Sequence, residues 1–332
     1  DHRDLHLSIR RQRQMCIRDR YNAGQLTTLI EKTLLKYRYF ICDVFTPRPF
    51  SGNQLAVLPE AEGLNEVQMQ QIAREFNFSE TAFVFPPEQG QTRKVRIFTP
   101  TSELPFAGHP NLGTAFSLYL NGYLGEKQDS IRIVFEEKAG WVPVSIDLAK
   151  NGDWFLELES PEPLSLGKEL SVESVCQALS LSAEEIEIQN HHPRVASVGL
   201  PFLMVEVSSI DALQKARSVV DFSKQFHAQG LPFIHVYLRS GDEFDIRSRM
   251  FAPFDGVTED PATGSANCAL AGLLSELKEE EEGEFSWKIA QGVEMGRPST
   301  LFARAKKVEG KTVKTWIGGN CVQIAEGMLK IS

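Results

Sequence analysis

The chain has 332 residues, of which 42% are hydrophobic and 24% charged, values typical of a globular protein with a sizeable core. Its formal net charge of -9 excludes a broad nucleic-acid-binding surface, because such a surface needs a basic stripe to neutralise phosphates. No apolar run approaches the roughly 18 residues of a membrane span. Five widely spaced cysteines without a CxxC pair are typical of a reducing compartment, so we expect a cytoplasmic protein.

The first 36 residues differ from the rest of the chain. Residues 1–38 carry nine Lys and Arg against four Asp and Glu, and residues 1–20 show no apolar period. They also lack the apolar core of a secretory signal, and their scattered aspartates argue against a transit peptide. We therefore interpret residues 1–36 as a non-native or disordered extension that takes no part in function.

Strands and helices become predictable from Tyr39. Strands are expected at 39–45, 55–58, 79–87 and 94–100. A further helix is expected from Pro110 to about Asn121, where an Asn-Gly pair ends it.

A helix is also expected after Asn65. Asn65 can cap it with Gln68 as the reciprocal partner, and the helix should stop near Asn77. Its apolar face is predicted to consist of Val67, Ile72, Ala73 and Phe76.

Three segments recur in the same order later in the chain. The matched pairs are 95–100 with 248–253, 107–115 with 263–271, and 131–144 with 287–300. Their offsets of 153, 156 and 156 residues are nearly constant, which favours an internal duplication. The fold class is therefore predicted as α+β, with two similar halves that each wrap a mostly antiparallel sheet around a helix.

The boundary between the predicted halves falls near the proline-rich segment 158–168. We assign 37–158 to the N-terminal half and 159–332 to the C-terminal half, whose last strands could return to the first half. Arg96 and Arg249 match each other across the repeat, which indicates a structural use rather than chemistry. The acidic run at 275–285 is predicted to be a solvated loop.

Each half is predicted to enter a helix after a glycine and a small polar group. Gly108–His109 opens the first helix and Gly264–Ser265 the second. The first turn of a helix exposes backbone N–H groups and the positive end of its dipole, so two such turns facing one cleft would hold a carboxylate. The alternative for either loop alone is an ordinary helix cap.

The motifs at these positions resemble one family. DVFTPRPFSGNQLAV, NFSETAFV, RIFTPTSELPFAGHPNLGTA and DPATGSANCALAG are similar to motifs of the PhzF-like (phenazine biosynthesis) family, which is related in fold to diaminopimelate epimerase. The resemblance runs from about Tyr39 almost to the C-terminus. It implies two pseudo-symmetric, barrel-like domains with the active site between them, a homodimer, and a cofactor-free isomerase like the family member that isomerises a dihydro-hydroxyanthranilate.

The resemblance places the acid/base carboxylate on Glu80 and carries over His109, Asp260 and Ser265 as further site residues. From the residues themselves we also expect substrate contacts at Gly108 and Gly264, where a ligand can approach the backbone, and at Asn53. A carboxylate can move a proton between two carbons if partial burial raises its pKa towards neutrality, and Glu80 stands at the head of an apolar strand. A histidine at a positive helix end should be held neutral and could donate one hydrogen bond to developing charge.

Structural alternatives exist for each of these side chains. Glu80 could be an exposed strand-end glutamate, and His109 a local cap or a satisfied core histidine. Asp260 could be a turn aspartate before a proline, and Ser265 a helix cap. Asn53 could equally serve a turn.

Other activities fit the sequence less well. Thr263–Asn267 is not a GxSxG nucleophile elbow, and no Lys follows Gly113 as a P-loop requires. His191 and His192 lack further metal ligands nearby, so no metal site is expected. That no cofactor is expected is what the family resemblance implies. A racemase with two opposed thiols would need a cysteine at each helix start, whereas Cys268 has no counterpart. A non-catalytic binding protein of the same fold remains the alternative to an isomerase.

Overall fold

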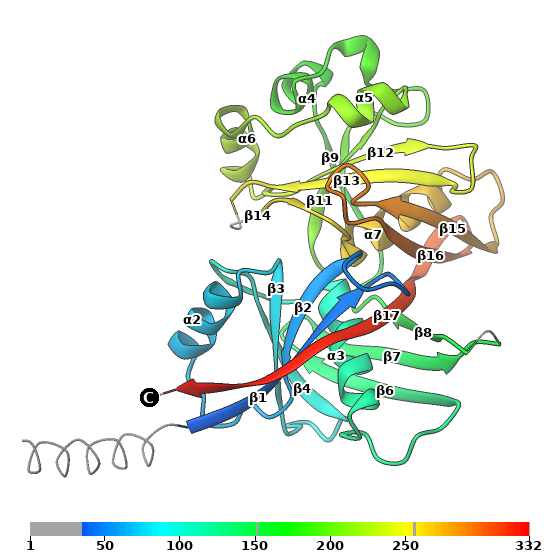
Figure 1. Cartoon of the computed structure of the whole chain (residues 1–332). Coiled ribbons are helices and arrows are strands. Elements are labelled where there is room, and N and C mark those ends of the chain that lie inside the picture. Colours follow the sequence, from blue (N-terminus) through cyan, green and yellow to red (C-terminus); the bar gives the residue numbers. More distant parts are fainter. Residues whose placement is uncertain (1–34, 151, 255–256, 332) are drawn as a thin grey trace, which may run out of the picture. The chain divides into compact units, whose positions relative to one another are not determined.

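The computed structural model of the protein describes residues 35–150, 152–254 and 257–331 (Figure 1). It contains two compact units, one made of residues 1–38 and 327–332 and the other of Tyr39–Glu326. In the first unit the described residues are strand residues. The predicted extension therefore lies outside the described residues up to position 34, and Leu35 and Lys36 belong to the first strand. Among the described residues, no helix has the length and apolar character needed to cross a membrane.

The unit Tyr39–Glu326 is dominated by strands. Its first part contains residues 39–44 of β1 (Leu35–Val44) and the strands β2 (Asn53–Leu58), β3 (Glu80–Phe85), β4 (Arg93–Phe98), β5 (Glu103–Leu104), β6 (Ser130–Glu137), β7 (Gly140–Leu148) and β8 (Trp154–Glu159). Neighbouring strands pair antiparallel at β1–β2, β3–β4, β6–β7 and β7–β8, and parallel at β2–β3 and β4–β6. Helices provide the two parallel crossovers, α2 (Glu66–Phe76) and α3 (Gly108–Leu120).

The second part repeats this pairing order. Its strands are β9 (Ser165–Glu169), β10 (Arg194–Ser197), β11 (Pro201–Glu206), β12 (Ile234–Arg239), β13 (Ile246–Ala252), β14 (Val257–Asp260), β15 (Gly283–Gln291), β16 (Ser299–Val308) and β17 (Lys311–Ile331). Antiparallel pairs occur at β10–β11, β12–β13, β15–β16 and β16–β17, and parallel pairs at β11–β12 and β13–β15. Strand β17 then pairs with β8 of the first part.

The remaining helices of the described residues lie in the second part. They are α4 (Val172–Leu179), the short 3-10 helix η1 (Ala183–Glu185), α5 (Ile210–Lys215), α6 (Val220–His227) and α7 (Gly264–Glu276). Helix α7 packs against β10, β11, β15 and β16, whereas α3 packs against β2, β3, β7 and β8. Figure 1 shows α3 and α7 each among the strands of its own part.

The predicted helix after Asn65 is confirmed in its ends and corrected in its apolar face. The Asn65 side chain accepts a hydrogen bond from the backbone N–H of Gln68, and the Gln68 side chain accepts one from the backbone N–H of Asn65. Asn77 ends the helix in the left-handed region. Val67, however, is 66% exposed, and the third buried residue beside Ile72 and Ala73 is Met69. A helical period leaves several candidate faces, and the position of β3 and β4 decides which one is buried.

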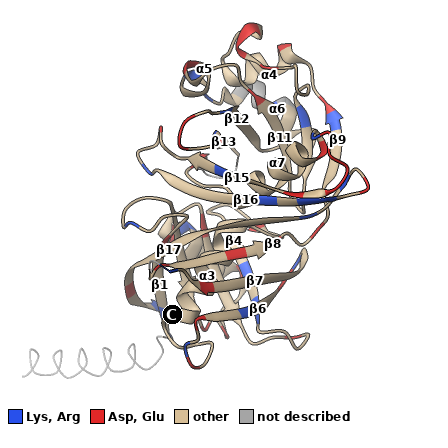
Figure 2. Cartoon of the chain, turned by 90° about the vertical axis from the view of Figure 1, so that its right-hand side faces the viewer, with Lys and Arg blue, Asp and Glu red and all other residues tan. Residues whose placement is uncertain are grey.

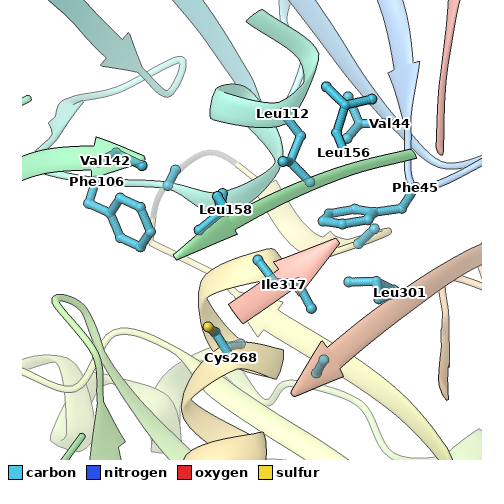
Figure 3. Packing of buried hydrophobic residues seen from close by; sticks show 14 of the residues in the cluster. Val44, Phe45, Phe106, Leu112, Val142, Leu156, Leu158, Cys268, Leu301 and Ile317 are labelled. Atoms are coloured by element: carbon cyan, nitrogen blue, oxygen red, sulfur yellow. The ribbon is translucent and has the colours of Figure 1, made fainter. Parts of the chain in front are cut away.

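One continuous hydrophobic cluster joins the two parts of the chain. It includes Leu112 of α3, Cys268 of α7, and Phe45 and Ile317 between them. Figure 3 shows these side chains converging where the two helices begin. A second cluster lies among α4, α5 and strands β10–β12. The shared cluster fixes the two helix starts relative to each other, because close-packed interiors transmit small displacements.

The two matched arginines make the same interaction. Arg96 forms two short hydrogen bonds with Glu103 and lies over the ring of Phe98, with 5.2 Å between the guanidinium carbon and the ring centroid. Arg249 forms the equivalent pair with Glu259 and lies 4.9 Å from the centroid of Phe251. Their expected structural use is confirmed.

Charged side chains are scattered over many elements. In Figure 2, the Lys and Arg residues of the described chain lie on several strands rather than on a single element. The acidic run predicted as a loop is exposed over 277–282, between α7 and β15, and its first residues belong to the end of α7.

Candidate functional site

The starts of helices α3 and α7 touch each other through their backbones. A β-carbon built on Gly108 would lie 2.7 Å from the Cα of Gly264 and 2.8 Å from the backbone nitrogen of Ser265. Real β-carbons do not approach so closely, so both positions need glycine for space. The sequence prediction that two helix beginnings converge is therefore confirmed.

Neither helix start is closed by a capping side chain within the described chain. The N-cap residue of α3 is Ala107, which has no polar side-chain atom. The N-cap residue of α7 is Thr263, whose hydroxyl donates to the Asp260 carboxylate rather than accepting from the helix. The side chains of Ala107 and Thr263 therefore do not cap their helices. Ordinary capping was the structural alternative for each loop. The arrangement leaves the positive ends of two helices available to an anion.

A pocket opens beside the two helix starts. Its empty volume is about 420 Å³ including the opening to solvent, and both N-cap residues, Ala107 and Thr263, line it. The polar lining is Ser79, Glu80, Thr99, Asp260, Thr263 and Ser265, and the apolar lining includes Leu104, Leu200, Phe202, Phe233, Met250 and Ala252. Residues from both sides of the predicted boundary near 158 therefore form one wall. This combination suits a small ligand with an apolar body and one anionic group.

Glu80 is enclosed at the edge of this pocket. It is the first residue of β3, and only 14% of its side chain is exposed. Its Oε2 atom lies 3.3 Å from Nε2 of His109. The alternative of a freely exposed strand-end glutamate is therefore wrong.

His109 lies behind the pocket as a neutral imidazole. It is 2% exposed, and this burial lowers its pKa to about 3. The expectation of a neutral histidine agrees with this shift, although the cause differs. Loss of hydration on burial is the largest effect, rather than the positive helix end invoked from the sequence.

Asp260 receives hydrogen bonds from three side chains. Thr263 Oγ1 donates to Oδ2 at 2.6 Å and Asn53 Nδ2 donates to Oδ1 at 2.8 Å. Burial raises the pKa of the Asp260 carboxyl above its ordinary value, and the hydrogen bonds from Thr263, Ser79 and Asn53 oppose that shift. The donors thus hold the carboxylate in one orientation at the pocket wall.

The predicted site residues divide into two groups. Glu80, Asp260 and Ser265 line the pocket, whereas Asn53, Gly108, His109 and Gly264 lie behind its lining. Asn53 is 1% exposed, and its amide nitrogen also contacts the Ala262 carbonyl at 2.9 Å and His109 Nδ1 at 3.1 Å. Asn53 therefore ties together the two parts of the site, a role that neither of the sequence interpretations described.

Four polar residues near the site were missed by sequence reasoning, and one of them, Thr99, lines the pocket. Ser79 and Thr263 also line the pocket and donate hydrogen bonds to Asp260. Gln291 donates a hydrogen bond to the Thr263 hydroxyl. Ser79 stands next to Glu80 and Thr263 next to Gly264, so adjacency was a usable signal. Gln291 is remote in sequence, and only its place within the repeated segment 287–300 marked it.

Cys268 is not placed for thiol chemistry. Its side chain is fully buried in the core and donates to Thr315 Oγ1 at 3.2 Å. Burial raises the pKa of its thiol to about 12, so it stays protonated at neutral pH. This opposes the two-thiol racemase alternative.

Comparison with known proteins identifies a family. The family model for phenazine biosynthesis-like proteins matches residues 42–327. A trans-2,3-dihydro-3-hydroxyanthranilate isomerase of Pseudomonas fluorescens is 37% identical over 295 residues, covering 88% of this chain and 99% of the relative. An uncharacterised isomerase of Mesorhizobium japonicum is 37% identical over 303 residues, covering 88% and 98%.

A solved structure is similar over the same region. The phenazine biosynthesis protein of the PhzF family from Bacillus anthracis has a TM-score of 0.80 and 25% sequence identity, covering 90% of this chain and all of its own. The fold is a sheet-rich α+β fold, and relatives named as isomerases match this protein over most of its length. The protein is therefore an isomerase. The chain belongs to the phenazine biosynthesis-like (PhzF) family.

Proposed function

We propose that the pocket beside α3 and α7 is the active site of a cofactor-independent isomerase. Its substrate is a small carboxylate, and Glu80 is the group that moves a proton between two of its carbons. The observation that carries this proposal is the enclosure of Glu80 within 3.3 Å of His109, in a pocket lined by the N-caps of two helices.

The reaction follows from these positions. The backbone N–H groups at the two helix starts bind the substrate carboxylate, and the apolar wall receives its carbon skeleton. Glu80 as a carboxylate removes a proton from one carbon, and the electron pair of that C–H bond shifts into the adjacent unsaturated system. The resulting Glu80 carboxylic acid returns the proton to a second carbon. The electrons are held by the substrate itself, so the step needs no cofactor.

Asp260 and Ser265 bind and orient the substrate in this proposal. Asp260 presents an acceptor to an amino or hydroxyl group, since its other contacts are all donors. His109, neutral and beside Glu80, contributes hydrogen bonding without a charge of its own. Because the Pseudomonas fluorescens relative is named for trans-2,3-dihydro-3-hydroxyanthranilate, that compound is the first substrate to test.

The finer description of the fold also belongs to the proposal. We infer that the site lies between two pseudo-symmetric halves produced by duplication. Support comes from the repeated order of strand pairing, from the equivalent pairs Arg96–Glu103 and Arg249–Glu259, and from two equivalent helix bonds. In these bonds Asn111 donates to the Ala107 carbonyl and Asn267 to the Thr263 carbonyl, each at 2.9 Å.

Proton exchange in heavy water tests the function. The protein is incubated with trans-2,3-dihydro-3-hydroxyanthranilate in D₂O, and deuterium on carbon is followed by NMR and mass spectrometry. Glu80→Gln, which keeps shape but cannot accept the proton, should lower exchange by at least about 100-fold while ligand binding persists. Glu88→Gln makes the same change at an exposed site and should exchange at the original rate. Exchange by Glu80→Gln at that rate would contradict the proposal.

A further inference from the structure

Gln291 is hydrogen-bonded to residues at the start of helix α7. It is the last residue of β15 and is fully buried. Its Oε1 atom accepts from the backbone N–H of Thr263 at 3.1 Å and from Nδ2 of Asn267 at 2.7 Å. Its Nε2 atom donates to the Asp260 carbonyl at 2.9 Å and to Thr263 Oγ1 at 3.0 Å. Both donors and both acceptor positions of the amide are used.

These contacts determine which way the Gln291 amide faces. A backbone N–H can only donate, so the side of Gln291 that meets Thr263 N must be its oxygen. The opposite side meets the Asp260 carbonyl, which can only accept, so it must be the nitrogen. The amide orientation therefore follows from the network and not from the shape of the side chain alone.

The orientation of Gln291 in turn determines the direction of the Thr263 hydroxyl. Thr263 Oγ1 accepts from Gln291 Nε2, so its single proton remains for its other close partner. That partner is Oδ2 of Asp260, at 2.6 Å. His235 extends the network on the far side, because its Nε2 lies 3.2 Å from Asn267 Oδ1.

We infer that Gln291 is a positioning residue: it directs the Thr263 hydroxyl proton to Asp260 and so holds the Asp260 carboxylate as an acceptor that faces the pocket. The inference rests on the proposed function only for the part that Asp260 plays in binding substrate. Gln291 itself does not line the pocket and acts through Thr263.

The first helix start lacks this device. Its N-cap residue is Ala107, which has no hydroxyl to direct. Glu137 lies near Asn111, but neither of its carboxyl oxygens makes a hydrogen bond like the one that joins Gln291 to Asn267. Burial raises the pKa of the Glu137 carboxyl well above its ordinary value. Glu137→Gln is the control at the first helix start, because it changes a carboxyl near Asn111 and leaves Gln291, Thr263 and Asp260 in place.

The test compares Gln291→Met, Thr263→Val and the double variant with Glu137→Gln. The pKa of Asp260 is measured by carbon-13 NMR titration of its carboxyl, which requires no turnover, and the pH profile of deuterium exchange is recorded beside it. Loss of one charge-assisted hydrogen bond should raise the pKa of Asp260 by about one unit in each single variant. The acidic limb of the exchange profile should move by the same amount.

The double variant decides whether Gln291 acts through Thr263. Its shift should not exceed that of the larger single variant, because both changes remove the same interaction. Thr263→Ser should restore the original value, and Glu137→Gln should leave it unchanged. If Gln291→Met does not fold, Gln291→Glu keeps its shape and attracts the Thr263 proton away from Asp260, so the shift should be larger.

Two results would overturn the inference. One is an unchanged pKa of Asp260 in a folded Gln291 variant, and the other is additive shifts in the double variant. If the pKa of Asp260 shifts but deuterium exchange is unchanged, Gln291 is still a positioning residue. That result would contradict only the proposed role of Asp260 in the reaction. The two ideas can therefore fail separately.

Discussion

Gly108 and Gly264 face each other across van der Waals contact, and neither position has room for a β-carbon. On Gly264 a β-carbon would lie 2.9 Å from the Cα of Gly108, and on Gly108 it would lie 2.7 Å from the Cα of Gly264. Neither glycine has a positive φ, so the requirement is for space rather than for backbone freedom. Because each is the first residue of its helix, this contact sets the distance between the two helix starts.

Gly108→Ala and Gly264→Ala should therefore separate the helix starts. We expect each to lower the free energy of unfolding by about 1–3 kcal/mol, as overpacking of a close contact does, and to reduce deuterium exchange. Gly272→Ala is the control on α7, since its β-carbon would meet side-chain atoms of Leu164 and Thr315 rather than backbone atoms. The alanine would also raise helix propensity. Denaturant unfolding measures all three variants. Equal stability of Gly264→Ala and Gly272→Ala would argue against the close contact.

Stability should fall with acid because two buried histidines stay unprotonated in the folded protein. Burial lowers the pKa of His109 to about 3 and that of His235 to about 4, from 6.5. Between pH 6.5 and these lowered pKa values, both histidines are protonated in the unfolded chain but not in the folded chain. Unfolding therefore takes up protons, and the free energy of unfolding falls as pH falls. Each histidine contributes at most about 1.4 kcal/mol per pH unit below 6.5.

His235→Gln isolates one of these contributions. The variant should lose less stability than the parent between pH 6.5 and 5, with the slope reduced by up to about 1.4 kcal/mol per pH unit. Groups such as Asp260, whose raised pKa acts with the opposite sign, remain in both proteins and cancel in the comparison. Parallel slopes would mean that His235 titrates normally in the folded state.

Cys268→Ser should leave deuterium exchange essentially unchanged. The thiol is buried, stays protonated, and donates to Thr315, a bond that a serine hydroxyl can also make. A cost of about 0.5–1.5 kcal/mol in the free energy of unfolding is expected from the changed packing. Loss of exchange in a folded Cys268→Ser protein would restore the thiol racemase alternative.

The two matched arginines should differ in their contribution to stability. Arg249 is 8% exposed and also donates to the carbonyls of Leu213, Gln214 and Ala216. Arg249→Met leaves these carbonyls and Glu259 without their buried cation, at a cost of about 3–5 kcal/mol.

Arg96→Met should cost less, about 1–2 kcal/mol, because Lys138 still pairs with Glu103 at 2.5 Å. Urea unfolding of both variants measures the difference. Equal losses would show that the three carbonyl contacts of Arg249 carry no extra stability.

Features that depend on neighbouring residues could be predicted from the sequence. The Asn65 capping box and the helix end at Asn77 use atoms within a few residues of one another, so residue type and spacing suffice. The repeated segments likewise indicated two equivalent helix starts, because a duplication preserves order and spacing. The position of Glu80 at the head of an apolar strand came from the same local pattern.

Features that depend on contacts between distant segments required the tertiary structure. Only the fold shows that Val67 faces solvent, that Asn53 bridges His109 and Asp260, and that Gln291 directs the Thr263 hydroxyl. It also replaces the helix dipole by burial as the main reason for a neutral His109. Residue order limits which groups can be present at a site. Burial and hydrogen-bond direction depend on which remote atoms surround each group, and packing alone decides that.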